Sequence, residues 1–197
     1  MLPTLDWIRN NMIEIATKNN IPEQVENTWR HSECVWKFAE KIADAAMKNG
    51  YVVDKDFLKI ACFSHDFGRM YTGSKGSKEL LPAVQHGVLG AKFFRSHGYE
   101  ELARVCERHI GGIGLSKEEN KKFGLGNEDC FVETIEEIIL GYADARTSST
   151  KKNGKYVPII GSFQSAFRRF TGINKKNGKK LIELQVFIKE ITGSAIK

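Results

Sequence analysis

The chain has 197 residues, of which 41% are hydrophobic, which suits one domain with a sizeable core and argues against a second full domain. Four cysteines, Cys34, Cys62, Cys106 and Cys130, lie far apart without a CxxC pair, so a disulfide framework or a zinc knuckle is not expected. No apolar run reaches the length of a membrane span and the first twenty residues do not resemble a signal peptide, so we expect a soluble cytoplasmic protein without a membrane partner.

The net charge of +6 is unevenly distributed. Residues 147–197 carry 11 Lys and Arg against 2 Asp and Glu, whereas residues 1–146 carry 19 against 22. The simplest interpretation of the basic tail is a solvated lysine-rich face. The alternative is a surface that attracts phosphates, including those of nucleic acid, but Phe163, Phe167 and Phe170 have helical spacing and are better explained as core than as a stacking platform.

Helical periodicity dominates the chain. From Pro22 to Gly50, apolar residues recur close to one face of a 3.6-residue repeat, which predicts one long amphipathic helix. Ser116 and Glu119 have the spacing of a capping box for a short helix. The other segments with helical patterns are, in chain order, 56–65, 82–97, 99–112, 129–148, 162–171 and 178–192. No alternating strand pattern competes with them.

These elements predict an all-α protein. A break at 148–158, rich in Ser, Lys and Gly, separates a compact helical bundle in residues 1–148 from a basic, helical C-terminal extension in residues 149–197. We expect the extension to pack on the same domain as an appendage.

Three of the five histidines lie on apolar helix faces and are predicted to point inward: His31, His65 and His109. A lone histidine on such a face is usually a core residue held by one hydrogen bond to a carbonyl. Three of them, with Asp66 directly after His65, favour a functional cluster instead. An inward carboxylate at Asp144, late in a predicted helix, must be paired, hydrogen-bonded or bound to a cation. Imidazole and carboxylate together are ligands of Mn, Fe, Co, Ni or Zn, and carboxylates also admit Mg.

The order of His31, then His65 with Asp66, then Asp144 resembles the HD-domain superfamily of metal-dependent phosphohydrolases. The phrase "HDFG" is similar to the HDIG form used in part of that superfamily. The resemblance covers about residues 29–148, and it implies a compact HD-domain helical bundle in which these four residues hold a divalent metal.

Two further histidines, His86 and His109, resemble in order and spacing the extra pair found in HD proteins with a two-metal site. The resemblance therefore implies one or two metal ions. The alternatives are that both side chains contact the substrate phosphate or orient a water beside a single metal, or that both are core residues.

The sequence also departs from particular branches of the superfamily. The "GYP" signature of the branch that acts on cyclic dinucleotides is absent. In the deoxynucleotide 5'-nucleotidase branch a glutamate stands three residues beyond the HD aspartate, whereas this chain has Arg69 there. Neither activity has specific support.

Hydrolysis of a phosphoester needs an activated water and neutralisation of charge on the phosphoryl oxygens. Asp66 is the candidate to hold or accept the proton of the water. Arg69, one helical turn further on, has the reach for a bidentate grip on a phosphate, or for an ordinary surface salt bridge. The further candidates for an outer ring around the phosphate are Lys75, Lys78, Arg108 and Arg146.

The sequence therefore predicts a metal-dependent phosphohydrolase, either a phosphomonoesterase or a phosphodiesterase, that acts on a nucleotide or another small phosphoester. The competing hypothesis is a non-catalytic HD-fold module that binds metal with a phosphorylated ligand, or nucleic acid through the basic tail. The substrate, the metal and the oligomeric state are left open.

Overall fold

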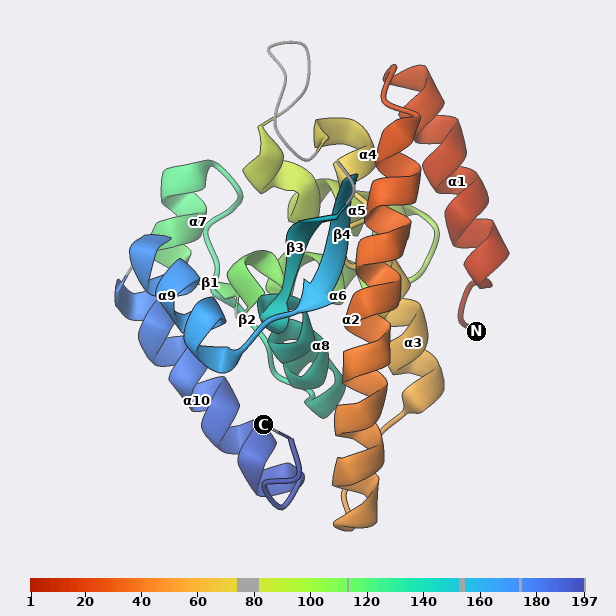
Figure 1. Cartoon of the computed structure of the whole chain (residues 1–197). Helices are drawn as coiled ribbons and strands as arrows, with labels where there is room; N and C mark the ends of the chain where they lie inside the picture. Colours follow the sequence, from red (N-terminus) through yellow and green to blue (C-terminus); the bar gives the residue numbers. More distant parts are fainter. Residues whose placement is uncertain (74–81, 113, 153–154, 174, 197) are drawn as a thin grey trace.

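The computed structural model describes residues 1–73, 82–112, 114–152, 155–173 and 175–196. The fold is an all-α bundle with two small antiparallel pairs of strands, which confirms the predicted fold class (Figure 1). The helices of the bundle are α1 (Leu5–Lys18), α2 (Glu23–Lys48), α3 (Lys55–Ser64), α4 (Arg69–Thr72), α5 (His86–Ser96), α6 (Glu100–Arg108), α7 (Lys117–Phe123) and α8 (Ile135–Arg146). The remaining elements are the short turns η1 (Ala83–Gln85) and η2 (Ile110–Gly112), the strands β1 (Gly114–Leu115), β2 (Cys130–Phe131), β3 (Thr147–Lys152) and β4 (Lys155–Ile160), and the C-terminal helices α9 (Phe163–Ile173) and α10 (Lys175–Ile191).

The long helix α2 is the spine of the bundle, as the apolar periodicity predicts. Its buried stripe includes Val35, Ile42 and Ala46, and it packs against α3 on one side and α8 on another. Because side chains three or four residues apart share a helix face, the same stripe directs His31 towards the interior. The helix thus places one polar ring where α3 and α8 meet it.

Side-chain caps set where several helices begin. Thr4 and Asp54 accept backbone N–H groups at the start of α1 and α3. Ser116 and Glu119 form the predicted capping box at α7. A second capping box, between Thr134 and Glu137, starts α8.

The helix predicted over 129–148 is shorter in the structure. The capping box at Thr134 starts α8 only at Ile135, and the residues before it form β2, which pairs with β1 through Gly114 and Phe131. Gly114 has a φ of +82°, and a Cβ there would lie 1.9 Å from the carbonyl oxygen of Cys130. A glycine at this position is therefore what lets the two chain segments meet.

The expectation that no strands occur is wrong at the break after α8. Residues Thr147–Lys152 and Lys155–Ile160 form an antiparallel hairpin, β3 with β4, in which Thr147 is opposite Ile160. The sequence held a signal for it, because Asn153-Gly154 between runs containing Thr, Tyr, Val and Ile is typical of a two-residue hairpin turn. The pattern is short and mixed with lysines, which hides the alternation.

The C-terminal helices pack on the bundle and share its core. Leu181 and Ile188 of α10 belong to the same buried cluster as residues of α2 and α8. A polar contact adds to this packing, since the hydroxyl of Tyr142 donates to Gln185 on α10 and accepts from Nη1 of Arg146 at 2.6 Å. Phe170 is buried, in agreement with its predicted place in the core. The division of the chain at residue 148 stays a prediction.

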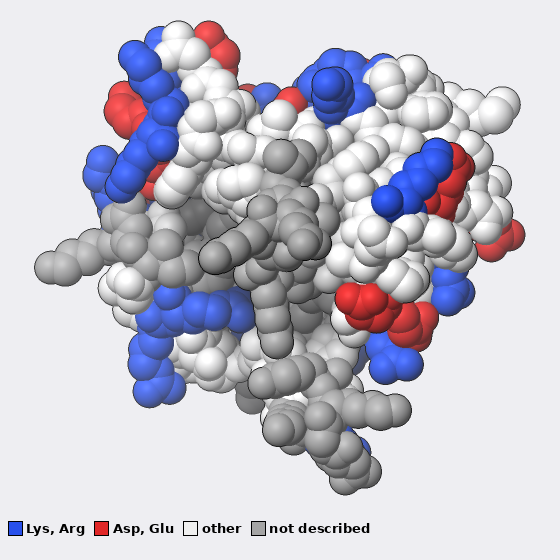
Figure 2. Space-filling model, turned by 90° about the horizontal axis from the view of Figure 1, so that it is seen from above, with Lys and Arg blue, Asp and Glu red and all other residues white. Residues whose placement is uncertain are grey.

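The helices of the described residues are amphipathic rather than uniformly apolar, and charged side chains lie on the surface (Figure 2). None of the helices in the described part of the chain combines the length and the apolar character needed to cross a bilayer. Viewed from above, many Lys and Arg side chains lie on the left of the molecule, the side on which Figure 1 places α7, α9 and α10 (Figure 2). Further Lys and Arg side chains lie at the top and on the right of the same view, so they are not confined to one side of it (Figure 2).

Candidate metal centre and cavity

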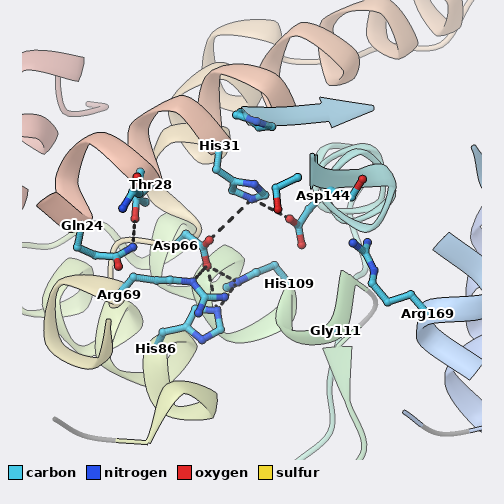
Figure 3. Close-up of a pocket in the computed structure, with 14 residues that line it drawn as sticks. Gln24, Thr28, His31, Asp66, Arg69, His86, His109, Gly111, Asp144 and Arg169 are labelled. Atoms are coloured by element: carbon cyan, nitrogen blue, oxygen red, sulfur yellow. Dashed lines mark hydrogen bonds and ion pairs between the residues drawn. The ribbon is translucent and has the colours of Figure 1, made fainter. Parts of the chain in front are cut away.

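Six side chains from different parts of the chain converge, and five of them line a cavity (Figure 3), whereas His65 is fully buried. His31 comes from α2, His65 and Asp66 follow the end of α3, and His86 is the first residue of α5. His109 directly follows α6, and Asp144 lies near the end of α8. These side chains are His31, His65, Asp66, His86, His109 and Asp144. The structure therefore brings together all six residues that the sequence predicts as metal ligands.

Three of the histidine rings are held by the same local contact. Nδ1 of His65 lies 2.8 Å from the carbonyl oxygen of Cys62, Nδ1 of His86 lies 2.7 Å from that of Ala83, and Nδ1 of His109 lies 2.8 Å from that of Cys106. In each case the acceptor is three residues earlier.

A carbonyl can only accept, so these contacts assign the proton of each ring to Nδ1. Nε2, which faces the interior of the site, is then the ring nitrogen that can bind either a proton or a metal ion. This is the arrangement in which a histidine binds a metal ion while its other nitrogen fixes the orientation of the ring.

One side of the site joins His31, His65 and Asp144. Nε2 of His31 lies 3.0 Å from Oδ1 of Asp144 and 3.3 Å from Nε2 of His65. Oδ2 of Asp66 lies 3.8 Å from both of these Nε2 atoms. The potential ligand atoms of His31, His65 and Asp144 all lie within 4.8 Å of one another.

The other side of the site joins His86 and His109 to Asp66. Oδ1 of Asp66 lies 3.0 Å from Nε2 of His86 and 3.4 Å from Nε2 of His109, and the two Nε2 atoms are 2.9 Å apart. Such a spacing suits two ligands of one ion, whose bonds to imidazole are about 2.1 Å long. Asp66 thus directs one oxygen to each side of the site, as a bridging carboxylate does.

The buried carboxylate oxygens and ring nitrogens of this cluster need a positive charge close to them. Burial raises the pKa of Asp66, but Arg69 and His65 outweigh it and hold the pKa well below its usual range. Burial likewise raises the pKa of Asp144, and hydrogen bonds with His31 and His65 outweigh it and lower the pKa. Burial lowers the pKa of His109 to about 4. Two ionised carboxylates beside the Nε2 atoms of four imidazoles are a donor set that fits a divalent cation.

Protons should compete with the metal at His65. Burial lowers the pKa of this ring, but Asp66 and Asp144 outweigh burial, so that its pKa is raised above the usual value of 6.5. A protonated ring cannot bind a metal. We therefore expect the affinity for Mn²⁺ to rise with pH until the pH exceeds this raised pKa, and then to level off. Calorimetric titration with Mn²⁺ between about pH 6 and about pH 8.5 measures this dependence, and an affinity that is flat or falls with pH contradicts it.

Arg69 lies beside the cluster and lines the cavity. Its Nε donates to Oδ1 of Asp66 at 3.1 Å, and the carboxylate of Asp66 raises the pKa of the guanidinium. The pair is part of the site rather than a surface salt bridge. Since this bond uses Nε, the Nη groups have no hydrogen-bond partner among the described residues and can hold an anion.

Two other predicted phosphate contacts lie elsewhere. Arg108 forms an ion pair with Glu133 at 2.6 Å, and Arg146 is buried with its Nε donating to the carbonyl oxygen of Gly161 at 2.8 Å. The residues that line the cavity include neither arginine. Sequence proximity to His109 and Asp144 suggested both, but each side chain leaves its helix on a face turned away from the cavity. Lys75 and Lys78 lie outside the described residues.

The cavity also has walls that the motifs did not predict. Its volume is about 620 Å³, and it is bounded by neutral polar groups on α2 and β3 and by one arginine of α9. The lining residues that the sequence analysis missed are Gln24, Asn27, Thr28, Gly111, Ser148, Ser149, Pro158 and Arg169. The Asn153-Gly154 pattern, which the sequence analysis treated only as part of a break, is a sequence signal that bears on this wall, because β3 and β4 supply Ser148, Ser149 and Pro158.

Gly68, the glycine of "HDFG", lies where the surrounding backbone leaves no space for a side chain. A Cβ at this position would lie 1.8 Å from the carbonyl oxygen of His86 and 2.8 Å from the backbone nitrogen of Gly90. These are backbone atoms, so no side chain can swing aside. The close approach of α4 and α5 at this glycine sets the position of His86.

We expect Gly68→Ala to destabilise the protein by about 1–3 kcal/mol or more and to displace His86 from Asp66. Denaturant unfolding and elemental analysis of metal content measure the two effects. Gly172→Ala in α9 is the matched control, because a Cβ there meets nothing within 4 Å. Equal stability and metal content in the two variants would refute this explanation.

The bundle and its histidine–aspartate cluster define a class of helical proteins with a candidate metal centre. The family model described as HD domain matches residues 28–148, which is more than half of the chain. The chain therefore belongs to the HD domain family.

Several known proteins are similar to this chain. An uncharacterised protein of Methanocaldococcus jannaschii is 36% identical over 128 residues, which cover 64% of this chain and 70% of the relative. Two proteins named tRNA (cytidine(56)-2'-O)-methyltransferase are also similar. The protein from Picrophilus torridus is 32% identical and the protein from Thermoplasma volcanium is 30% identical, over 58% and 50% of this chain. The matches span only 30% and 27% of those two proteins.

Among solved structures, the HD domain of the phosphodiesterase PgpH of L. monocytogenes is similar, with a TM-score of 0.44 and 19% identity over 84% of this chain and 92% of that one.

Proposed function

We propose that this protein is a metal-dependent phosphohydrolase that acts on a nucleotide or another small phosphoester. One observation carries the proposal, namely that the Nε2 atoms of four histidines and the carboxylates of two aspartates converge, and that all of these side chains except His65 line a cavity of about 620 Å³. Membership of the HD domain family supports it. The cavity has the size of a site for a small organic ligand.

The residues of the site would have different roles in the reaction. A bound divalent cation would lower the pKa of a water molecule and stabilise charge on the phosphoryl oxygens. His31, His65 and Asp144 would hold an ion on one side, His86 and His109 on the other, with Asp66 between them. The depressed pKa of Asp66 makes it a weak proton acceptor, so its main role is that of a ligand which also orients the water by a hydrogen bond. Arg69 would bind the phosphoryl oxygens through its Nη groups.

A metal screen with a substrate panel tests the proposal. The purified protein is supplied in turn with Mn, Fe, Co, Ni, Zn or Mg. Release of inorganic phosphate is measured from nucleotides and other phosphomonoesters, and release of the alcohol or phenol product is measured from phosphodiesters. We expect release that a chelator stops and that added metal restores. A protein that binds none of these metals at the six side chains contradicts both the metal site and the activity.

The second candidate function is an HD module that binds a phosphorylated ligand or nucleic acid without turnover. It is favoured by the basic tail and by the similarity to two proteins named as tRNA methyltransferases, although this chain spans less than a third of each. Salt-dependent gel shifts with tRNA, in the absence of phosphate release from any substrate, would support this function. Phosphate release without a gel shift would support the enzyme.

A further inference from the structure

Two arginines line the cavity on opposite sides of the metal ligands. Arg69 belongs to α4, directly after "HDFG", whereas Arg169 belongs to α9, beyond the residues 28–148 that match the family model. In Figure 3 the two side chains approach the cluster from opposite directions, with Asp66, His109 and Asp144 between them. The C-terminal extension thus adds a cationic wall to a site whose metal ligands all come from the bundle.

The two arginines differ in how their charge is balanced. Nε of Arg69 donates to the carboxylate of Asp66 at 3.1 Å. Arg169 donates from Nη1 to the carbonyl oxygen of Thr147 at 3.2 Å and from Nη2 to that of Ala145. No carboxylate forms an ion pair with Arg169 within the part of the chain that the structure describes.

Main-chain carbonyls fix the Arg169 side chain without cancelling its charge. A guanidinium has five N–H donors, and two contacts leave three of them for a ligand. The two bonds also hold the group in place at the end of α8, which lowers the entropy cost of binding an anion there.

The other residues that line the cavity outside the cluster are uncharged, and most of them are polar. Gln24 and Thr28 on α2 are buried and hydrogen-bonded to each other at 2.9 Å, and Ser148 and Ser149 line the cavity from β3. These groups suit hydroxyl or amide groups of a ligand. A fixed positive charge at Arg169, away from the scissile phosphoryl group, is complementary to a second anion.

We propose that Arg169 is a specificity residue, and that the ligand of this cavity carries a second anionic group that Arg169 binds while its phosphoryl group lies over the metal ligands beside Arg69. The inference deepens the proposed function, on which it rests for the position of the phosphoryl group. It concerns binding, so its test needs no turnover.

The test compares ligands that cannot be hydrolysed and that differ by one charge. An alkylphosphonate and the ω-carboxyalkylphosphonate of the same chain length are titrated into the Mn-supplied protein by calorimetry, over several chain lengths. We expect the wild-type protein to bind the carboxylated member of at least one pair about 10- to 100-fold more tightly, the range of one charge-assisted hydrogen bond. Arg169→Gln should remove this preference and Arg169→Lys should keep part of it.

Arg168→Gln is the matched control, since Arg168 is exposed like its neighbour Arg169 but does not line the cavity. A loss of fold in Arg169→Gln would weaken both members of a pair, so the ratio of the two affinities separates recognition from stability. The inference is overturned if the wild-type protein does not prefer the carboxylated ligand in any pair. It is also overturned if Arg169→Gln retains this preference to the same extent as Arg168→Gln. If the preference holds while no phosphoester is hydrolysed, the proposed enzyme fails and the anion site stands.

Discussion

Replacing Asp66 with alanine is expected to abolish phosphate release. Asp66 directs Oδ1 towards His86 and His109 and Oδ2 towards His31 and His65, so its loss removes a ligand from both sides of the site at once. Loss of a partner outside the ligand shell already costs about 10- to 100-fold in affinity or activity, and loss of a bridging ligand should cost more. Metal content and phosphate release, measured on the same sample, report the effect.

The control for this variant is Asp44→Ala. Asp44 is an exposed aspartate of α2 whose ion pair with Lys55 lies outside the cavity, so its replacement should leave turnover unchanged. Thermal melts of both variants show whether a loss of activity reflects unfolding, because Asp66→Ala also leaves Arg69 and the buried histidines without their carboxylate. Activity of folded Asp66→Ala within about threefold of wild type would refute the proposed mechanism, since a loss of that size is smaller than an outer-shell change produces.

His86→Ala and His109→Ala are expected to separate one metal ion from two. If both rings are ligands of a second ion, either change lowers the metal content from about two to about one per chain and reduces the rate steeply, because the second ion shares water activation and phosphate binding. The 2.9 Å separation of their Nε2 atoms and the shared approach to Oδ1 of Asp66 favour this outcome. Elemental analysis of the folded variants measures it.

Two other results would assign different roles to these rings. If both contact the substrate, the metal content stays near one and binding weakens by about 1.5 to 3 kcal/mol, the scale of a lost charge-assisted hydrogen bond. If both are core residues, stability falls while metal content and rate per folded molecule persist. His97→Ala is the control, since His97 packs on Trp7 and Phe93 away from the cavity. Unchanged metal content in both His86→Ala and His109→Ala rules out the two-metal site.

The sequence was sufficient for most of the helices and for the members of the cluster, although α1 and α4 were not predicted. Apolar periodicity is local, so it shows which helix face is buried and therefore that His31 and His65 point inward. Helix caps are local as well, as the capping box of Ser116 and Glu119 shows. The order of His31, His65 with Asp66, and Asp144 was enough to predict the family.

Placement of the arginines depended on tertiary structure. Arg108 and Arg146 each follow a site residue closely, yet one pairs with Glu133 and the other packs beside Tyr142. Arg169 lies 25 residues beyond Asp144 in the sequence, yet it lines the same cavity, because its bonds to Ala145 and Thr147 attach α9 to the end of α8.

A sequence shows which arginines stand close to a site residue along the chain. Packing between helices decides which carboxylate or ligand each of those arginines contacts. The same holds for Asp66, whose position between two groups of histidines arises only where α2, α3, α5 and α6 come together. The amino-acid sequence therefore determined most of the helices, the family and the candidate ligands, through patterns that act within a few residues along the chain. Only the tertiary structure decided how Asp66 faces both sides of the site and which arginines enter the cavity, because those contacts join residues that are distant in the chain.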